Sequence, residues 1–272
     1  MDSTIILTMA RSGSTFLGRK LLGMSGYNKP KFWHHNEVGF EGFFIKNKLE
    51  WMVKYDLLKY SDNIKENFDP KIHHRLLETN KYSDLAYYST NRWSLQKVVE
   101  NCSTPVFNVH LFQISEKPYL IKKITSPIIF LIRKNNWQRM ISQYLHNKQM
   151  TPAHVEADSS PNRLKQIDVE IGKNDLDEMI TAADYQVNLI RTFQKELKDE
   201  ENVKFIYYED IQHPSYWTEE FIDSLEDFMK VKFTNRNYQV PFVKTRDLVN
   251  LQNEEDIMTK ELIEKYYIEE SL

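Results

Sequence analysis

The sequence contains a single cysteine, Cys102, among 272 residues. One thiol excludes an intrachain disulfide and a zinc site built from cysteines, and it is typical of a reducing compartment. The chain also lacks an apolar run of membrane-spanning length, and no basic segment followed by a long apolar stretch stands at its start. We therefore expect a cytoplasmic protein without membrane insertion.

A basic excess is absent as well. The chain has 36 Lys and Arg residues against 39 Asp and Glu, which gives a formal net charge of −3 and no indication of nucleic acid as a partner. No repeat or linker divides the sequence, and its length favours one large α/β domain over residues 1–272. The sequence does not indicate an oligomeric state.

Glycine is scarce and unevenly placed. Six of the seven glycines fall within the first 42 residues, namely Gly13, Gly18, Gly23, Gly26, Gly39 and Gly42. Because glycine permits left-handed backbone and close approach to a ligand, we expect a special backbone conformation or a ligand contact near the start of the chain.

Four short β-rich runs are nearly continuously apolar. They are residues 4–10 (TIILTMA), 104–111 (TPVFNVHL), 126–133 (SPIIFLIR) and 202–210 (NVKFIYYED). Such runs are typical of strands buried on both faces of a parallel sheet. Between them, apolar residues recur at helical spacing, most clearly from Leu176 to Leu197. The alternation predicts an α/β, P-loop-like fold with a central parallel sheet of four to five strands flanked by helices.

Two segments fall outside this framework. Residues 43–103 are aromatic and helical in pattern, with few turn signals, and we interpret them as a helical cap inserted over the sheet. Residues 149–172 have two prolines and weak periodicity, which suits a mobile lid and an ordinary surface loop equally well.

The residues after the first strand are Arg11-Ser12-Gly13-Ser14-Thr15, followed by a helix. A helix N-terminus offers backbone N–H groups and a positive dipole, Gly13 lets the backbone close around a tetrahedral anion, and Arg11 adds a full charge. A simple cap by Ser12 or Ser14 needs only one hydroxyl, so the cluster favours an anion-binding loop. The lysine of the GxxxxGK[ST] motif is absent.

The other predicted strands also end in polar side chains. Arg133 follows the third strand, and Ser142 lies in the next helix, so both could grip one anion. His110 ends the second strand and suits either a general base or a structural histidine, of which the latter is commoner for a lone histidine. After the fourth strand, Glu209 and Asp210 suit either magnesium ligands or caps of the next turn, and we favour caps.

In order and spacing these motifs resemble the sulfotransferases that use 3′-phosphoadenosine 5′-phosphosulfate (PAPS). The resemblance covers roughly residues 1–26, 104–146, 202–214 and 240–257 and leaves the helical middle unmatched. It implies that the loop from Arg11 to Thr15 binds the 5′-phosphosulfate. Arg11 stands where many members have lysine, and the form R-S-G-S-T is similar to that of bacterial and carbohydrate-type members.

The resemblance assigns further nucleotide contacts. Arg133 and Ser142 resemble the pair that binds the 3′-phosphate, with a gap one residue longer than in the cytosolic enzymes. Tyr208 resembles the tyrosine of the family's Y-E-D segment, which lies beside the adenine and needs no magnesium. The late run Lys244-Thr245-Arg246 resembles the basic loop that closes on the 3′-phosphate, although by itself it reads as a charged surface turn.

The general base has more than one candidate. His110 lies some two dozen residues before Arg133 at the end of the preceding strand, like the base of the cytosolic sulfotransferases, but the family's lysine two residues earlier is Asn108 here. Other branches use a glutamate shortly after the first helix, and Glu37 and Glu41 are the candidates for that role.

The resemblance implies transfer of the sulfuryl group from PAPS to a hydroxyl or amine of a small-molecule acceptor, such as a glycan, glycolipid or secondary metabolite. The product would be 3′-phosphoadenosine 5′-phosphate (PAP), with Arg11 stabilising the departing phosphate and no metal required. The paired histidines His34-His35 and His73-His74 do not form a ligand set. Two alternatives stay open: a P-loop-like small-molecule kinase or nucleotide hydrolase, and a non-catalytic nucleotide-binding protein on the same fold.

Overall fold

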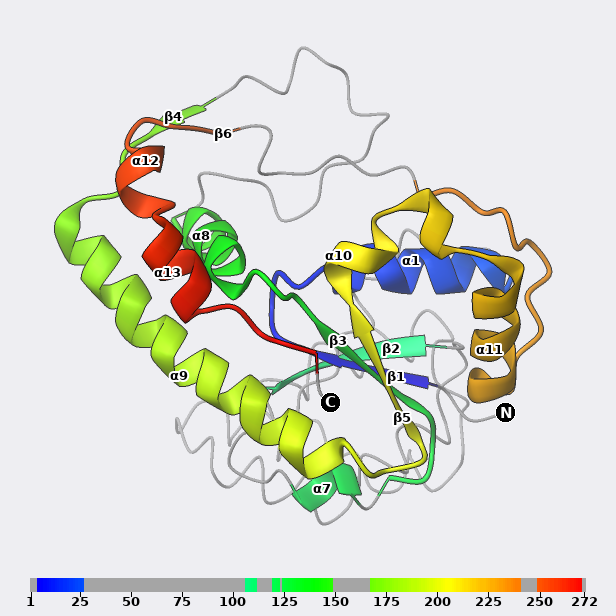
Figure 1. Cartoon of the computed structure of the whole chain (residues 1–272). Helices are drawn as coiled ribbons and strands as arrows, with labels where there is room; N and C mark the ends of the chain where they lie inside the picture. Colours follow the sequence, from blue (N-terminus) through cyan, green and yellow to red (C-terminus); the bar gives the residue numbers. More distant parts are fainter. Residues whose placement is uncertain are drawn as a thin grey trace, which may run out of the picture.

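The computed structural model describes residues 4–26, 106–111, 119–122, 124–148, 167–240 and 249–270. Its centre is a parallel sheet of four strands (Figure 1), namely β1 (Thr4–Thr8), β2 (Val106–His110), β3 (Ile128–Ile132) and β5 (Val203–Tyr207). They lie in the order β2-β1-β3-β5, and each neighbouring pair is parallel. The predicted α/β class and central parallel sheet are confirmed, and each strand lies inside the run predicted for it.

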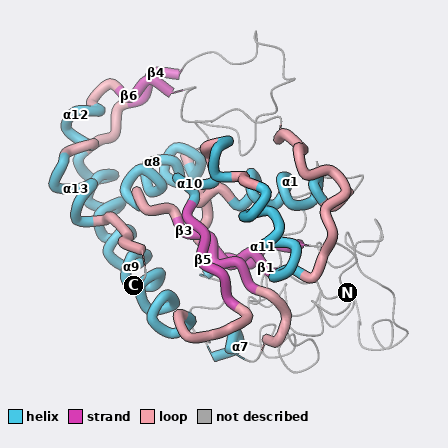
Figure 2. The backbone as a smooth tube through the Cα atoms, turned by 45° about the vertical axis from the view of Figure 1, so that its right-hand side comes forward, coloured by secondary structure: helices cyan, strands magenta, loops and turns pink. Residues whose placement is uncertain are grey.

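Helices cover both faces of the sheet (Figures 1 and 2). The longer ones are α1 (Ser14–Met24), α8 (Asn136–Asn147), α9 (Lys173–Leu197) and α11 (Glu219–Met229). The shorter ones are α7 (Tyr119–Lys122), α10 (Tyr208–Ile211), the 3-10 turn η5 (Pro214–Tyr216), α12 (Glu254–Ile257) and α13 (Lys260–Lys265). Helix α9 is the long amphipathic helix that the apolar spacing predicts.

Alternate residues of each strand face two separate cores. Ile6, Ile129 and Leu131 pack with the apolar side chains of α1 and α11. Ile5 and Phe130 point to the other face and pack with α8, α9 and the C-terminal residues. All five side chains are essentially inaccessible to solvent, which explains why the strands are mostly apolar in sequence rather than strictly alternating.

A second, two-stranded parallel sheet joins β4 (Ile167–Val169) to β6 (Val249–Leu251). Asp168 Oδ1 accepts hydrogen bonds from the side-chain amides of Asn250 at 2.8 Å and Gln252 at 2.9 Å. The end of the segment predicted as a lid or surface loop therefore forms a strand in residues 167–169. Residues 149–166 lie outside the described part of the chain, as does the predicted cap over residues 43–103.

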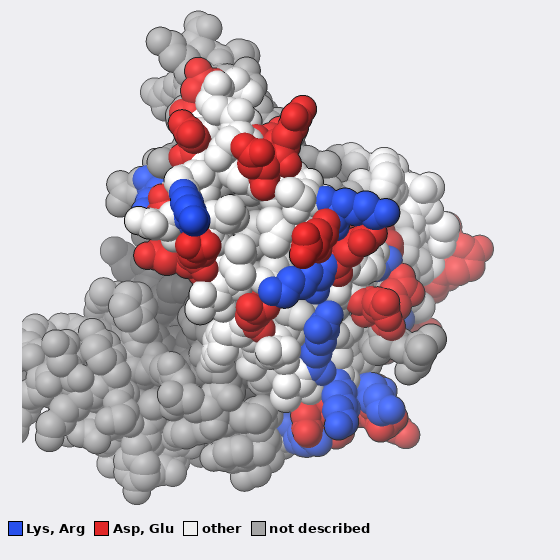
Figure 3. All heavy atoms as spheres, turned by 60° about the vertical axis from the view of Figure 1, so that its left-hand side comes forward, with Lys and Arg blue, Asp and Glu red and all other residues white. Residues whose placement is uncertain are grey.

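The described surface carries charges of both signs. Figure 3 shows acidic and basic side chains interspersed over the described part of one face, in keeping with the small net charge of −3. Among the helices that the structure describes, none is both long and apolar enough to cross a lipid bilayer.

The C-terminal segment that follows α13 lies beside the loop that leaves β3. Tyr267 forms an isolated antiparallel bridge with Asn135, and the Ile268 N–H donates to the Lys134 carbonyl at 2.9 Å. The Lys134 ammonium also forms an ion pair with Glu270 at 2.6 Å. This loop begins at Arg133, so the C-terminal residues help to hold one of the predicted site residues.

Candidate anion-binding site

The order of the strands determines where a ligand crevice can form. Strand β1 has β2 on one side and β3 on the other, so the chain changes direction across the sheet between β2 and β3. In open α/β sheets, ligands bind at the carboxyl ends of the strands beside such a switch point. The loops after β1 and β3 both start at this point, which brings two sequence motifs more than a hundred residues apart into one place.

The backbone of the loop after β1 alternates in handedness. Arg11 has a φ of 65° and Gly13 a φ of 90°, whereas Ser12 between them and Ser14 at the start of α1 do not have positive φ. Such alternation turns successive backbone N–H groups into an anion-binding concavity, as in phosphate-binding loops. A left-handed arginine costs about 1–2 kcal/mol, so the surrounding structure must hold Arg11 in place.

Helix α1 begins without a side-chain cap. Its N-cap residue is Gly13, and no side chain accepts a capping hydrogen bond there. Ser12, Ser14 and Thr15 are all buried beside it, with Ser12 only 1% exposed. The alternative explanation of this cluster, that Ser12 or Ser14 is simply the N-cap, is wrong.

Two arginines meet at the loop. Arg11 Nε donates to Ser142 Oγ at 3.2 Å, and Arg133 Nη1 donates to the Arg11 carbonyl at 3.4 Å. Burial, followed by the charge of Arg133, lowers the pKa of Arg11, and burial also lowers the pKa of Arg133. Arg11, which is predicted to bind the 5′-phosphosulfate, therefore lies beside Arg133 and Ser142, which are predicted to bind the 3′-phosphate.

Tyr208 lies between the two motifs. A Cβ atom added to Gly13 would lie 2.1 Å from Tyr208 Cδ2, so the ring packs directly on the glycine. The Arg133 guanidinium carbon lies 5.2 Å from the centre of the same ring. A glycine is therefore needed at position 13 for space as well as for its left-handed φ.

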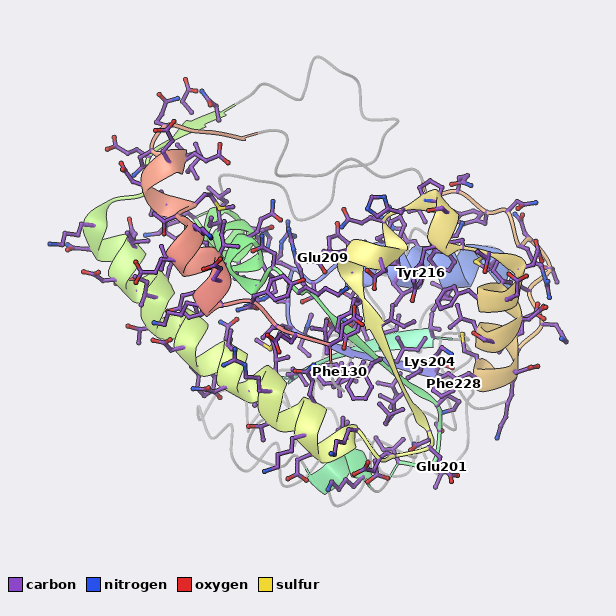
Figure 4. The ribbon with its side chains drawn as sticks, in the orientation of Figure 1. Phe130, Glu201, Lys204, Glu209, Tyr216 and Phe228 are labelled. Atoms are coloured by element: carbon purple, nitrogen blue, oxygen red, sulfur yellow. The ribbon has the colours of Figure 1, made fainter. Side chains whose placement is uncertain are left out.

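The acidic pair after β5 binds the loop after β3. The two Glu209 carboxylate oxygens accept hydrogen bonds from the backbone N–H groups of Lys134 at 2.9 Å and Asn135 at 3.0 Å. Asp210 forms an ion pair with Lys134 at 3.1 Å. Figure 4 labels Glu209 where β5 passes into α10. Glu209 and Asp210 lie within α10, and the expected cap of the following turn does not form, because no side chain caps α10 or the 3-10 turn η5.

A metal site is not apparent around these carboxylates. Within the described ranges, no group of three or more His, Cys, Asp or Glu side chains is arranged to hold a metal ion. Glu209 and Asp210 already have protein partners, so their geometry favours a structural role over the magnesium ligands of a phosphoryl-transfer enzyme.

We predict that Glu209→Gln destabilises the loop after β3. The amide keeps one acceptor oxygen but turns an NH₂ donor toward a backbone N–H, which loses a hydrogen bond to a charged group and costs roughly 1.5–3 kcal/mol. Denaturant unfolding would measure the change. The matched control is Glu201→Gln, an exposed glutamate just before β5, labelled at the other end of this strand in Figure 4. Equal stability of the two variants would contradict the role assigned to Glu209.

His110 ends β2 at the same edge of the sheet. It is 7% exposed, and in the strand register it pairs with Thr8, the last residue of β1. Its Nε2 atom lies 3.4 Å from Nδ2 of Asn108, which is fully buried. His110 is therefore one strand away from the anion-binding loop, and its role as general base stays a prediction.

Several predicted residues lie outside the part of the chain that the structure describes. They are the alternative bases Glu37 and Glu41 and the basic run Lys244-Thr245-Arg246. Their roles remain predictions from the sequence.

The sequence reasoning missed Arg139, which is 1% exposed. Its Nη1 donates to the Ala10 carbonyl at 3.0 Å, its Nε donates to Asn136 Oδ1 at 2.6 Å, and its Nη2 donates to the Gln186 side-chain oxygen. Burial and the nearby charge of Arg133 lower the pKa of Arg139 to about 9. A signal was available, because Arg139 precedes Ser142 by three residues and so shares its face of α8.

Comparisons with known proteins give little further guidance. No protein-family model matches the sequence, and no curated protein matches it. One solved structure, a sulfotransferase domain from the curacin biosynthetic pathway, is similar over 97% of this chain and 90% of that chain, with a TM-score of 0.36 and 14% sequence identity. A likeness of this strength does not assign the chain to a family.

Proposed function

We propose that this protein is a sulfotransferase that carries the sulfuryl group of PAPS to a hydroxyl or amine of a small-molecule acceptor. The observation that supports it best is the loop of alternating φ after β1, which adjoins Arg133 and Ser142 at the switch point of the sheet. The loop suits one tetrahedral anion, and the second guanidinium suits another on the same ligand. A nucleotide with charged groups on the 5′ and 3′ positions of one ribose meets this requirement.

In this reaction the acceptor oxygen or nitrogen forms a bond to sulfur while the bond from sulfur to the 5′-phosphate oxygen breaks. Arg11 and the loop N–H groups stabilise the charge that develops on that oxygen, and PAP leaves. His110 takes the acceptor proton, with Glu37 or Glu41 as the alternatives. Tyr208 lies beside the adenine, and Lys244, Thr245 and Arg246 close on the 3′-phosphate.

A P-loop-like kinase or nucleotide hydrolase is the first alternative. A kinase of this kind would bind ATP with magnesium. The loop after β1, however, lacks the lysine of the GxxxxGK[ST] motif, and both Glu209 and Asp210 have protein partners.

The second alternative is a nucleotide-binding protein without catalysis. Asn108 favours it, because Asn108 stands where the sulfotransferases that the sequence resembles have a lysine. It predicts nucleotide binding and no sulfuryl transfer.

The experiment that tests the proposal is calorimetric titration with PAP in the presence of a chelator, compared with ATP plus magnesium. Tight binding of PAP without metal is the expected result. Absence of PAP binding, or a preference for magnesium-ATP, would overturn the proposal and favour the kinase alternative.

Arg133→Ala is predicted to weaken PAP binding by roughly 10- to 150-fold, since a charged contact to phosphate contributes about 1.5–3 kcal/mol. The same titration measures it. The matched control is Lys195→Ala, which removes an exposed basic side chain of α9. If both variants bind PAP like the wild type, Arg133 does not contact the nucleotide.

A further inference from the structure

We propose that Arg139 is a positioning residue of this site: it fixes the backbone of the loop after β1, and its charge strengthens anion binding without contact with the ligand. The proposal rests on the proposed function in one respect, namely that the loop binds an anion. Arg139 belongs to α8 and contacts the loop after β1 through the Ala10 carbonyl. None of the predicted nucleotide contacts involves Arg139.

Arg139 holds the peptide between Ala10 and Arg11. Arg139 Nη1 donates to the Ala10 carbonyl at 3.0 Å. In a trans peptide the carbonyl and the N–H of the next residue point in opposite directions, so this bond turns the Arg11 N–H away from α8. Arg133 holds the next carbonyl, that of Arg11, at 3.4 Å. Two guanidinium groups thus hold two successive carbonyls of the loop and support the left-handed conformation of Arg11.

Further hydrogen bonds hold the Arg139 guanidinium itself in place. Its remaining donors bind Asn136 and Met140 within α8 and Gln186 in α9. One guanidinium therefore joins the loop, α8 and α9, three elements that are far apart in sequence. Its planar fork of donors makes this possible, whereas a lysine ammonium could not reach all of these acceptors at once.

The guanidinium groups of Arg139 and Arg133 donate hydrogen bonds to uncharged acceptors. The hydrogen-bond acceptors of Arg139 are two amide oxygens, a thioether and a backbone carbonyl, and those of Arg133 are a backbone carbonyl and the Gln138 side chain. Among the described residues, no carboxylate forms an ion pair with either guanidinium. The Glu209 carboxylate acts on Arg133 through its charge, whereas among the described residues no carboxylate acts on Arg139 in this way. The buried charge of Arg139 is therefore not balanced within the described protein and is weakly screened, so an anion bound in the adjacent loop would balance it.

The test compares Arg139→Lys with Arg139→Gln. Lysine keeps the charge and loses part of the set of hydrogen bonds that holds the loop, α8 and α9 together, whereas glutamine loses the charge as well. Calorimetric titration with PAP is expected to give a dissociation constant roughly tenfold higher for Arg139→Lys and roughly 100-fold higher for Arg139→Gln. Added salt is expected to change the difference between the two variants little, because a buried charge is screened much less than an exposed one.

Thermal unfolding with and without PAP separates positioning from a purely structural role. If both variants lower the melting temperature of the free protein but bind PAP like the wild type, Arg139 is structural and the inference is overturned. If neither arginine variant folds, Gln186→Ala keeps the charge and the bond to Ala10 while loosening the guanidinium. It is expected to weaken PAP binding a few-fold, and an unchanged dissociation constant would overturn the inference.

Inorganic pyrophosphate serves as a second probe. A wild-type protein that binds pyrophosphate but not PAP would overturn the proposed function, and the effect of the Arg139 variants on pyrophosphate binding would still decide the inference. A wild-type protein that binds neither would overturn both.

Discussion

Replacing His110 with alanine is expected to lower the rate of sulfuryl transfer by roughly 10²–10⁴-fold, the usual contribution of a general base. The dissociation constant for PAP should change little, because His110 ends β2, whereas the anion-binding contacts join the loop after β1 to Arg133 and Ser142. Single-turnover formation of the sulfated product measures the rate, and calorimetry with PAP measures the binding.

The matched control for this prediction is His213→Ala, which removes an exposed histidine after α10. It should leave both transfer and binding unchanged. Near-normal turnover in the His110 variant would contradict its role and move the search for the base to Glu37 and Glu41. Loss of PAP binding together with turnover would instead mean that His110 supports the loop rather than the chemistry.

Gly13→Ala is expected to abolish detectable PAP binding and to destabilise the fold. An alanine with a φ of 90° costs about 1–2 kcal/mol. The new Cβ would also lie 2.1 Å from Tyr208 Cδ2, and overpacking of this kind adds about 1–3 kcal/mol. Relief requires movement of the loop or of the ring, and either movement disrupts the concavity that would hold the phosphosulfate. Thermal unfolding and calorimetry with PAP measure the two effects.

Gly172→Ala provides the matched control, because Gly172 has a φ of −69° and its added Cβ would meet only Asp175 Oδ2, at 3.9 Å. This variant should be as stable as the wild type. Combining Gly13→Ala with Tyr208→Ala removes the clash but not the backbone strain, so stability should recover in part while PAP binding stays weak. Wild-type affinity in the single Gly13 variant would rule out the loop as the anion site.

The sheet could be predicted from sequence because its signal is local. Each of the four strands lies within one nearly continuous apolar run, since burial on both faces favours apolar residues at most positions, although β2 contains Asn108 and β5 contains Lys204. The positions of Arg11, Arg133 and Tyr208 follow from the same logic, because side chains at the ends of neighbouring parallel strands share one edge of the sheet. Their contacts through Ser142 and Gly13 agree with that placement.

The supporting residues could not be predicted in the same way. Glu209 binds backbone N–H groups 74 and 75 residues earlier in the chain, and no pattern near Glu209 indicates which loop it will meet. The spacing of Arg139 from Ser142 indicates a shared face of α8 but not the acceptors of Arg139, because its burial depends on a carbonyl 129 residues away and on the side chain of Gln186. Both roles depend on tertiary contacts between backbone groups and side chains, which leave no periodic trace in the sequence.

The bonds between the C-terminal segment and the loop after β3 have a consequence for synthesis of the chain on the ribosome. Lys134 and Glu270 are 136 residues apart. The contacts that hold the loop after β3 can therefore form only after the segment around Tyr267 and Ile268 has been translated. The strands β1, β2, β3 and β5 all emerge earlier, and domains generally fold as units from the N-terminus onward. A nascent chain can therefore pair its central sheet before this loop is secured, and completion of the site follows the translation of residues 267–270.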